Sequence, residues 1–464
     1  MSMPRRYDVA VIGAGVVGCA LARRYALAGA AVVVIEKAAD ILDGASKGNS
    51  AILHTGFDAP PGSLEQACIA EGYAEFMAIR HRLNLPVLET GALVIAWTQE
   101  EEAELPRLMD QAKQNGISDI FPLTREQTLA AEAHLSPSVR ASFRVPREVV
   151  IDPWSAPLAY LTQATAMGAV LMRATEVTGG TFGGGIWRLD TGQGAVEANL
   201  VVNAAGLYGD VVDQRLVGES RFTVRPRKGQ FVVYDKPAAV LTRHILLTVP
   251  TKTTKGIVVC PTVFGNLLVG PTAEEQDARD RAELVPETLD ALRRRGEAIL
   301  PALAAEEITA VYAGLRPATD EKDYRIAYRS DLNYVTVGGI RSTGLSSALG
   351  AAAYVFRLTE SIAQWRPPET IPWPAVPNIS ETAPRDWQSP GHGGMVCQCE
   401  MVTEREVAAA LAGPLGARSL AGLKRRTRVT LGRCQGFHCL HRLAELTEPH
   451  FDVPIATPVG DDGR

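Results

Sequence analysis

The most constraining feature of this 464-residue chain is the segment VAVIGAGVVGCALARRYALAGAAVVVIEK near its N-terminus. Its pattern predicts a strand, a glycine turn, a helix and a second strand, with Gly13, Gly15 and Gly18 in the turn. The first glycine permits a tight turn, the second lets backbone amides approach a pyrophosphate, and the third lets helix and strand pack closely. Glu36 ends the second strand, where a carboxylate accepts hydrogen bonds from a ribose and disfavours a 2′-phosphate. The segment therefore predicts a Rossmann-type unit for FAD or NAD rather than NADP.

Three further segments of small residues lie far from the glycine turn in the sequence. They are GASKGNSAILHTGFDAPPGS (44–63), VVNAAGLYGD (201–210) and GGIRSTGLSSALGAA (338–352). Turns of this kind, returning to one nucleotide from distant parts of the chain, suit a cofactor held extended through the protein. A nicotinamide enzyme more often confines its nucleotide to one contiguous domain. The segments therefore favour FAD.

In this order, the segments resemble the FAD-dependent glycine-oxidase/glycerol-3-phosphate dehydrogenase superfamily across roughly residues 5–365. The stretch SKGNSAILHTGFDAPPGSLEQA is most similar to the branch of glycerol-3-phosphate oxidases and dehydrogenases and L-2-hydroxyglutarate oxidases. The resemblance implies an α/β fold in which a Rossmann-type FAD-binding domain is paired with a mixed-sheet substrate domain. Within 1–365, the expected FAD-binding parts are roughly 5–80, 150–215 and 310–365, and the expected substrate domain is roughly 81–149 and 216–309.

The same resemblance implies which residues contact the flavin. Val177 is expected at the adenine end of the cofactor, and 344–346 beside the isoalloxazine and ribityl groups. The full expected set is Gly13, Gly15, Val16, Val17, Gly18, Glu36, Lys37, Ser46, Asn49, Ser50, Val177, Ala205, Gly206, Gly314, Arg341, Ser342, Gly344, Leu345 and Ser346.

Four residues are candidates for the reaction itself. Oxidation of an alcohol or amine by a flavin needs a proton acceptor near the reacting carbon, and His54, directly after the flavin-lining turn, suits that task. By resemblance, Arg316 holds an anionic substrate and Lys255 reaches the same pocket. An in-sheet salt bridge remains the alternative for Arg316, and an ordinary turn position for Lys255. Arg341 is a further candidate for the flavin's pyrimidine edge or for the substrate.

The expected substrate is a small anionic alcohol, glycerol 3-phosphate or a related polyol phosphate. The last helix motif, RSTGLSSALGAA, departs from the more apolar, proline-containing version in glycerol-3-phosphate enzymes. An L-2-hydroxy acid or an amino acid therefore stays open as the alternative substrate on the same scaffold, for a dehydrogenase or an oxidase.

Four of the seven cysteines lie near the C-terminus, as CQC and, 34 residues later, CQGFHC. Cys397, Cys399, Cys434 and Cys439 supply the number of thiolates that one four-sulfur site needs. Structural zinc is one interpretation, although C-x-C is a less common start for a zinc module. Two disulfides are disfavoured in a reducing compartment. A [2Fe–2S] cluster needs two sulfurs on each iron, and two cysteine pairs on facing loops provide them.

The stretch VCQCEMVTEREV…GRCQGFHC resembles the bacterioferritin-associated ferredoxin-like [2Fe–2S] domain, over about 394–445. The resemblance implies a small helical [2Fe–2S] domain at 394–455, after a proline-rich linker at 366–393 and before a tail at 456–464. Electrons from FAD are then expected to leave singly, through the cluster, to a partner subunit or a quinone. The alternative is a zinc-stabilised module that assembles subunits. The nearby basic run, Lys424, Arg425, Arg426 and Arg428, either offsets thiolate charge or forms a solvated face.

Composition sets the outer limits of these interpretations. Hydrophobic residues make up 46% and charged residues 21%, which is ordinary for a globular enzyme. A net charge of -5 gives no sign of nucleic-acid binding. No run approaches about 18 uninterrupted apolar residues, so no membrane span is expected. The expected location is cytoplasmic, with room for peripheral contact at the inner face of the membrane and for a homo- or hetero-oligomer. Amphipathic helices are predicted at 97–115 and 281–304.

Overall fold

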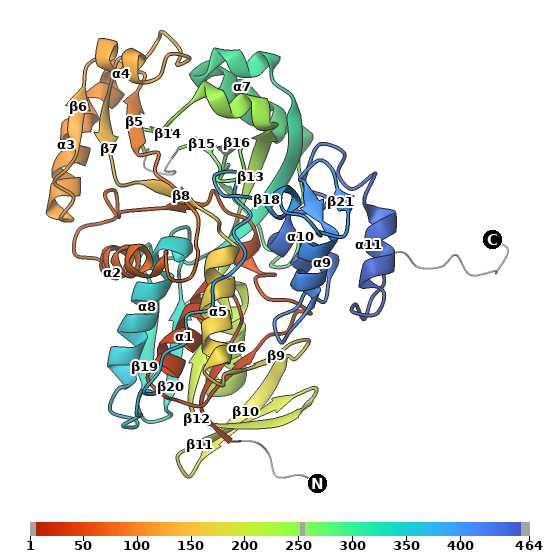
Figure 1. Ribbon diagram of the computed structural model, residues 1–464. Helices are drawn as coiled ribbons and strands as arrows, with labels where there is room; N and C mark the ends of the chain where they lie inside the picture. The colour runs from red at the N-terminus through yellow and green to blue at the C-terminus, as the bar shows by residue number, and fades with distance from the viewer. Residues whose placement is uncertain (1–5, 251–255, 456–464) are drawn as a thin grey trace.

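The computed structural model describes residues 6–250 and 256–455. A lower domain and an upper domain are stacked one above the other, and a third, C-terminal module lies against their side (Figure 1). The predicted glycine-turn unit is present as β1 (Arg6–Ile12), α1 (Val16–Leu27) and β2 (Val32–Ile35). Gly13 has a φ of 102°, and a Cβ there would lie 2.7 Å from the carbonyl oxygen of Ala204. A Cβ at Gly18 would overlap the carbonyl oxygen of Gly13, so helix and strand pack as closely as the sequence predicted.

The lower domain is built on an eight-stranded sheet in the order β10-β11-β12-β1-β2-β9, with β20 also paired to β12, and β19 to β20. Strands β12, β1, β2 and β9 pair in parallel with their neighbours in this order, and β20 pairs in parallel with β12. Alternate residues of β1 and β2 enter two different cores, and a sheet buried on both faces needs such continuous apolar strands. The added strands are β9 (Val170–Met172), β10 (Val177–Gly183), β11 (Ile186–Thr191), β12 (Gly194–Asn203), β19 (Arg325–Arg329) and β20 (Tyr334–Gly338).

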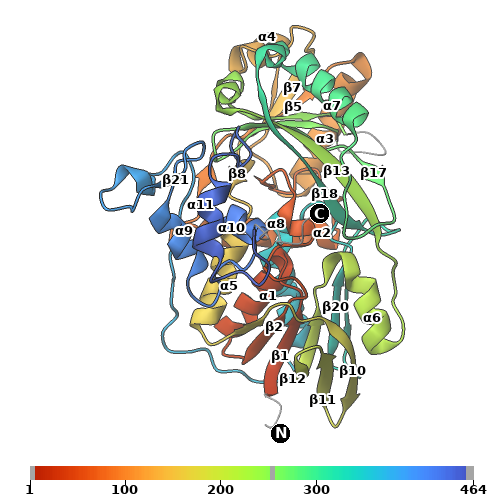
Figure 2. The same ribbon diagram turned by 90° about the vertical axis from the view of Figure 1, so that its right-hand side faces the viewer.

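Helices cover this sheet on both faces. One face packs against α1 together with α2, α5 and α8, and the other against α6 (Figures 1 and 2). Because both faces are covered, a ligand site is expected at the carboxyl ends of the parallel strands. The helix bounds are α2 (Leu64–Ile79), α5 (Ser155–Ala166), α6 (Gly209–Val217) and α8 (Gly344–Thr359).

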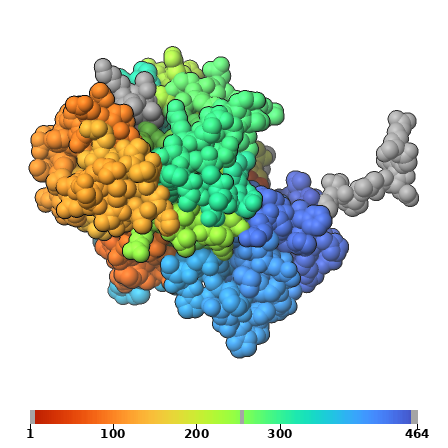
Figure 3. Space-filling view, turned by 90° about the horizontal axis from the view of Figure 1, so that it is seen from above, coloured from red at the N-terminus to blue at the C-terminus, as the bar shows by residue number. Residues whose placement is uncertain are grey.

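The upper domain is built on a nine-stranded mixed sheet in the order β17-β13-β16-β15-β14-β5-β7-β6, with β18 also paired to β13. Only β14 and β5 pair in parallel among its described strands. Seen from above, residues around 100–145 and 230–300 form its top, and the C-terminal module lies beside it (Figure 3). The bounds are β5 (Ala92–Ala96), β6 (Phe121–Leu123), β7 (Ala141–Val145), β13 (Arg225–Tyr234), β14 (Ile245–Thr248), β15 (Val258–Pro261), β16 (Leu267–Gly270), β17 (Glu274–Glu275) and β18 (Ile308–Ala318).

The helices that accompany this sheet include α3 (Gln99–Gln114), α4 (Arg125–Ala131) and α7 (Pro286–Ile299). The helix expected at 97–115 corresponds to α3, while the one expected at 281–304 is shorter, because Pro286 occupies its first turn and Pro301 follows its end. Strand β18 belongs to this upper sheet up to Ala318. The chain therefore leaves the upper sheet some residues later than the expected boundary near 310.

A small three-stranded sheet connects the two domains. It consists of β3 (Ile52–Leu53), β8 (Val149–Ile151) and β4 (Val87–Leu88) in the order β3-β8-β4. Leu53 is paired with Val149 in antiparallel register. The residue that follows β3 and the residue that precedes β8 are therefore brought side by side.

The C-terminal module has a core of its own. Its elements are β21 (Met395–Cys397), β22 (Val402–Thr403), α9 (Glu404–Leu411), α10 (Leu420–Thr427) and α11 (Leu440–Thr447). The side chain of Thr403 and that of Glu406 form the predicted capping box at the start of α9. Residues 366–394 contain no α-helix or strand and include one short turn of helix, η5 (Asp386–Gln388). None of the helices in the described ranges is long and apolar enough to cross a membrane.

One buried and one partly exposed ion pair hold the module on the lower domain. Asp40, which follows β2, accepts hydrogen bonds from Nη2 of Arg426 at 2.7 Å and from the backbone N–H of Arg418 at 2.9 Å. Arg425 lies 3.4 Å from Asp43. Both side chains of the Asp40–Arg426 pair are buried, at 1% and 7% exposure. Arg425 and Arg426 therefore form contacts between domains. The sequence alone had indicated either a solvated face or a role in offsetting the thiolate charge.

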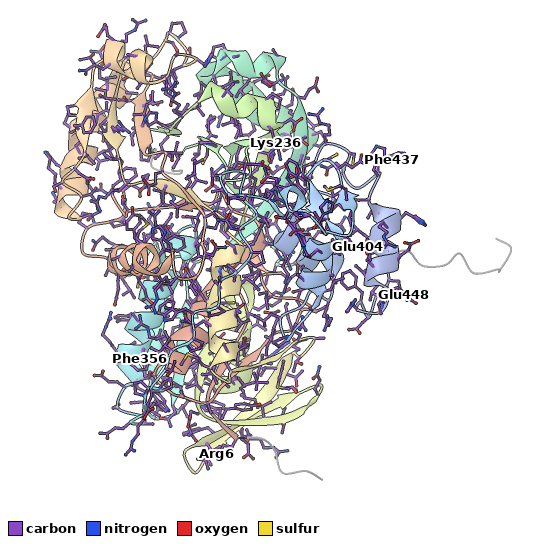
Figure 4. All side chains as sticks on the ribbon, viewed as in Figure 1. Arg6, Lys236, Phe356, Glu404, Phe437 and Glu448 are labelled. Atoms are coloured by element: carbon purple, nitrogen blue, oxygen red, sulfur yellow. The ribbon has the colours of Figure 1, made fainter. Side chains whose placement is uncertain are left out.

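A second contact joins the module to the upper domain. Nε of Arg428 binds the buried carboxylate of Glu400 at 2.7 Å, and its guanidinium lies over the ring of Phe264, 4.0 Å from the centroid. Nη2 of Arg428 donates to Asn266 at 3.2 Å. Lys236 lies at the same boundary (Figure 4), with Nζ 3.8 Å from Glu400. The module is thus fixed to both other domains.

The Asp40 contact can be tested directly. Replacing Asp40 by Ala leaves the buried guanidinium of Arg426 without its carboxylate, and breaking a buried pair costs about 3–5 kcal/mol. We expect a protease to cut within 366–394 markedly faster in Asp40→Ala than in the unchanged protein. The control is Glu404→Ala, which removes a partly exposed pair with Arg442 inside the module and costs about 1 kcal/mol or less. Equal cleavage of the two variants would show that Asp40 does not hold the module in place.

Candidate active site and candidate iron–sulfur site

A cavity of about 870 Å³ lies where the two domains meet. Its walls come from the glycine turn, the loop after β2, the start of α6, β13 and β18, and the segment before α8. Nineteen of the residues expected at the cofactor or the substrate line it, whereas Gly18 and Ser346 do not. Lys255 lies outside the described residues. The lining residues are Gly13, Gly15, Val16, Val17, Glu36, Lys37, Ser46, Asn49, Ser50, His54, Val177, Ala205, Gly206, Gly314, Arg316, Arg341, Ser342, Gly344 and Leu345.

The start of α1 is fixed in the cavity wall by two side chains. The backbone N–H of Val16 donates to Oγ of Ser46 at 3.0 Å, and that of Ala14 donates to Oε2 of Glu36 at 2.7 Å. Burial raises the pKa of Glu36. A helix that begins in a cavity wall favours a negatively charged group such as a pyrophosphate. The arrangement is the one the glycine fingerprint predicts for a dinucleotide.

A contact between two glycines forms another part of the cavity wall. A Cβ at Gly48 would lie 3.0 Å from Cα of Gly314, and a Cβ at Gly314 would lie 2.7 Å from the carbonyl oxygen of Gly48. The loop after β2 therefore touches β18 backbone to backbone. This contact explains the place of Gly314 in the cavity wall, although no local motif marks it.

His54 is held by a buried carboxylate that no sequence pattern singles out. Nδ1 of His54 lies 2.8 Å from Oε2 of Glu148, whose side chain is fully buried. The other oxygen of Glu148 accepts hydrogen bonds from the backbone N–H and the hydroxyl of Thr55, at 2.6 and 2.8 Å. The β3–β8 pairing brings His54 and Glu148 side by side. Oγ of Ser346 accepts a hydrogen bond from the backbone N–H of His54 at 2.8 Å. Ser346 thus supports His54 from behind the cavity wall.

Arg316 projects from β18 into the cavity beside Gly229. Its Nη2 donates to the carbonyl oxygen of Thr272 at 3.0 Å, and a Cβ at Gly229 would overlap the guanidinium. Burial, followed by the nearby charge of Arg227, lowers the pKa of Arg316 to about 10. In place of the alternative in-sheet salt bridge, the structure shows a guanidinium bound to a carbonyl at the cavity wall. Arg341 also lines the cavity, with Nη2 4.0 Å from Glu65.

The four C-terminal cysteines pair two by two. The pKa of Cys434 is lowered by backbone N–H groups, that of His438 first, and by the side chain of Cys399. Burial, with the neighbouring Cys397, raises the pKa of Cys439 to about 11. Across the described residues, no group of three or more His, Cys, Asp or Glu side chains is arranged to hold a single metal ion. Two pairs of thiols form the donor set that a [2Fe–2S] cluster takes, two on each iron.

The two pairs differ in depth. Cys397 and Cys439 are buried in the module's core at 1% exposure, whereas Cys399 and Cys434 are half-buried. Phe437, in the loop between the last two cysteines, is 83% exposed at the outer edge of the module (Figure 4). Lys424 lies near Cys439, and burial lowers its pKa. One pair of thiols is therefore close to solvent and the other faces the interior.

A Rossmann-type turn, a second mixed-sheet domain over it and a shared cavity define the class of flavin-dependent oxidoreductases. The chain belongs to the FAD dependent oxidoreductase family (DAO), which matches residues 8–358. A second match, to the BFD-like [2Fe-2S] binding domain, covers residues 395–448 and includes all four C-terminal cysteines. The protein is therefore an FAD-dependent oxidoreductase that carries a [2Fe–2S] module, and the match favours the cluster over zinc at the four cysteines.

Individual relatives share most of this architecture. A glycerol 3-phosphate dehydrogenase of Caloramator mitchellensis is 32% identical over 461 residues, which cover 97% of this chain and 95% of that protein. One component of the anaerobic glycerol-3-phosphate dehydrogenase of Escherichia coli strain K12 is 28% identical, over 95% of this chain and 88% of its own. The solved structure of an FAD-bound L-alpha-glycerophosphate oxidase from Mycoplasma pneumoniae superposes with a TM-score of 0.76 at 26% identity, covering 81% of this chain and 100% of its own.

Proposed function

We propose that the protein oxidises glycerol 3-phosphate, or a closely related polyol phosphate, at a secondary alcohol, and passes the electrons on through its [2Fe–2S] module. The observation that carries the proposal is the cavity that joins the FAD-type turn to a histidine–carboxylate pair and a half-buried arginine. The similarity over nearly the whole chain to a glycerol 3-phosphate dehydrogenase supports the substrate. Arg316 supplies the positive charge that an anionic substrate needs.

In this proposal, His54 acts as the general base. Because Nδ1 faces the buried carboxylate of Glu148, the imidazole is held with Nε2 as the acceptor for the hydroxyl proton. The carboxylate also stabilises the imidazolium that forms. FAD, when bound, supplies the hydride acceptor. Arg316 holds the anionic end of the substrate and so sets which carbon faces the flavin.

The chain's own residues suit both groups. FAD would be held by the glycine turn, by the loop after β2 and by the segment before α8. The cluster would be held by the two thiol pairs, Cys397 with Cys439 and Cys399 with Cys434. The cluster, when bound, accepts single electrons. The Escherichia coli relative is named as one component of a larger enzyme, which supports a partner protein as the electron acceptor, with a quinone as the alternative. A cytoplasmic location fits the proposal. If the partner protein is bound to the membrane, the location would be at the inner face of that membrane.

An anaerobic substrate screen tests the function. Purified holoprotein is mixed with glycerol 3-phosphate, L-2-hydroxyglutarate, L-lactate and amino acids, and loss of the oxidised flavin absorption is followed. We expect rapid bleaching with glycerol 3-phosphate and little with the others. Bleaching by a 2-hydroxy acid or an amino acid, with glycerol 3-phosphate inert, would replace the proposed substrate by the corresponding alternative.

A further inference from the structure

Three strands of the upper sheet bring a row of charged residues to the cavity. Glu275 on β17 is paired with Arg227 on β13, and Arg227 is paired in turn with Arg316 on β18. Directly opposite residues in an antiparallel pair carry their side chains on the same face of the sheet. Arg227 and Arg316 both line the cavity. The row therefore places two cations beside each other at the site and one carboxylate at its outer end.

We propose that Arg227 is a second phosphate-binding residue, which acts with Arg316 to select a dianionic phosphate monoester over a monocarboxylate. The proposal rests on the function proposed above and adds a specificity-determining residue to it. Its first support is the cross-strand arginine pair itself. Like charges directly opposite each other destabilise a sheet, and Glu275 offsets the charge of Arg227 only from its outer side, so an anion between the two guanidinium groups would relieve the remaining repulsion.

The two side chains differ in exposure. Arg316 is half-buried, and desolvation, followed by the nearby charge of Arg227, lowers its pKa. Arg227 is 32% exposed on its side chain, so it forms the outer member of the pair. Gly229 leaves the space into which Arg316 leans, two residues along the strand from Arg227. The missing side chain of Gly229 thus makes room for the guanidinium of Arg316, while Arg227 lines the cavity beside it.

A phosphate monoester fits this pair better than a carboxylate does. Near pH 7 a phosphate group carries about −1.5 to −2 charges and three strong acceptor oxygens. A carboxylate carries one charge and two oxygens, which the fork of one arginine satisfies. At the cavity, a second arginine therefore suits a phosphate better than a carboxylate.

Glu275 makes the proposal testable through the sign of an effect. Oε1 of Glu275 accepts a hydrogen bond from Nε of Arg227 at 2.6 Å, and the side chain of Glu275 is 59% exposed. The carboxylate of Glu275 therefore competes with a bound anion for the guanidinium of Arg227. If Arg227 binds phosphate, loss of the Glu275 charge strengthens substrate binding and loss of Arg227 weakens it. If the Arg227–Glu275 pair only stabilises the sheet, both changes act in the same direction.

The experiment compares Arg227→Gln, Glu275→Gln and Arg225→Gln with the unchanged holoprotein. Arg225 is an exposed residue of the same strand that does not line the cavity, and it serves as the control. For Arg227→Gln, KM for glycerol 3-phosphate should rise about tenfold or more, as expected for a lost charge-assisted hydrogen bond, with kcat within about threefold. For Glu275→Gln, KM should fall by about two- to threefold, and Arg225→Gln should leave both constants unchanged.

A binding measurement separates this proposal from the proposed function. The dissociation constant of inorganic phosphate, measured by calorimetry on the same holoproteins, should move with KM in each variant. If glycerol 3-phosphate does not reduce the FAD of the unchanged protein, the proposed function fails, and the phosphate titration alone decides on Arg227. Equal shifts in Arg227→Gln and Glu275→Gln, or an Arg227→Gln effect no larger than that of Arg225→Gln, would overturn the phosphate role.

Discussion

Substituting His54 by Gln is expected to slow the reduction of FAD by glycerol 3-phosphate by about 10²- to 10⁴-fold, the range that a positioned general base supplies. The hydride cannot leave the substrate carbon efficiently unless the hydroxyl proton has an acceptor, and glutamine is not a base near neutral pH. Stopped-flow mixing of the anaerobic protein with substrate measures this step directly. Because the step precedes any transfer to the cluster, the result does not depend on the final electron acceptor.

The carboxylate behind His54 should matter nearly as much. In Glu148→Gln, one carboxylate oxygen becomes an NH₂ group. That group has to face either the N–H of Thr55 or Nδ1 of His54. The first arrangement opposes two donors, and the second forces the other imidazole tautomer, in which Nε2 carries the proton. We expect flavin reduction to slow by at least about tenfold, with FAD content close to normal.

A second histidine–glutamate pair provides the control. Nδ1 of His244 lies 2.6 Å from Oε1 of the buried Glu132, in the upper domain and away from the cavity lining. Glu132→Gln removes the charge from a buried pair of the same kind, so it should cost stability without a specific loss in the rate of flavin reduction. If Glu148→Gln and Glu132→Gln slowed the reaction equally, His54 and Glu148 would be a structural pair only. Retention of full rate in His54→Gln would remove the proposed base altogether.

The sequence predicted those parts of the site that are encoded by local pattern. The glycine turn, Glu36 at the end of β2 and the capping box of Thr403 follow rules that act within a few residues. The structure shows each of them at the expected position. The family resemblance placed Arg316 and the loop of Ser46 at the cavity, and they line it. The four cysteines were recognisable because their spacing is unusual outside such a module.

The missed residues have no local pattern. Glu148 lies 94 positions from His54 and becomes its partner only through the β3–β8 pairing. Arg227 was one arginine among many until the pairing of β13 with β18 set it opposite Arg316. The charges of Arg425 and Arg426 looked like a solvated face because their acidic partners, Asp43 and Asp40, are nearly 400 residues earlier in the chain. Strand register and domain docking, which decide all three, are tertiary properties.

Replacing Cys434 by Ser should separate the two halves of the electron path. The serine hydroxyl does not replace a thiolate that backbone N–H groups hold at a lowered pKa, so one iron loses a ligand and the cluster absorption should be lost or strongly reduced. Glycerol 3-phosphate should still bleach the flavin at a rate within about threefold of normal, because the cavity lies in the other two domains. Steady-state turnover with the physiological acceptor should fall by at least about 10²-fold, since two-electron-reduced flavin then lacks its one-electron outlet.

The control for this variant is Cys68→Ala, which removes a buried thiol of α2 and should leave both the cluster spectrum and turnover with the acceptor intact. Iron, zinc and acid-labile sulfide are measured on the unchanged protein and on Cys434→Ser. Two irons and two sulfides per chain, lost together in the variant, support the cluster. Zinc without sulfide in the unchanged protein would instead make the module an assembly unit. If Cys434→Ser lost its cluster but turned over normally with the acceptor, electrons would leave directly from the flavin, and the module's buried contacts with Asp40 and Asn266 would serve architecture alone.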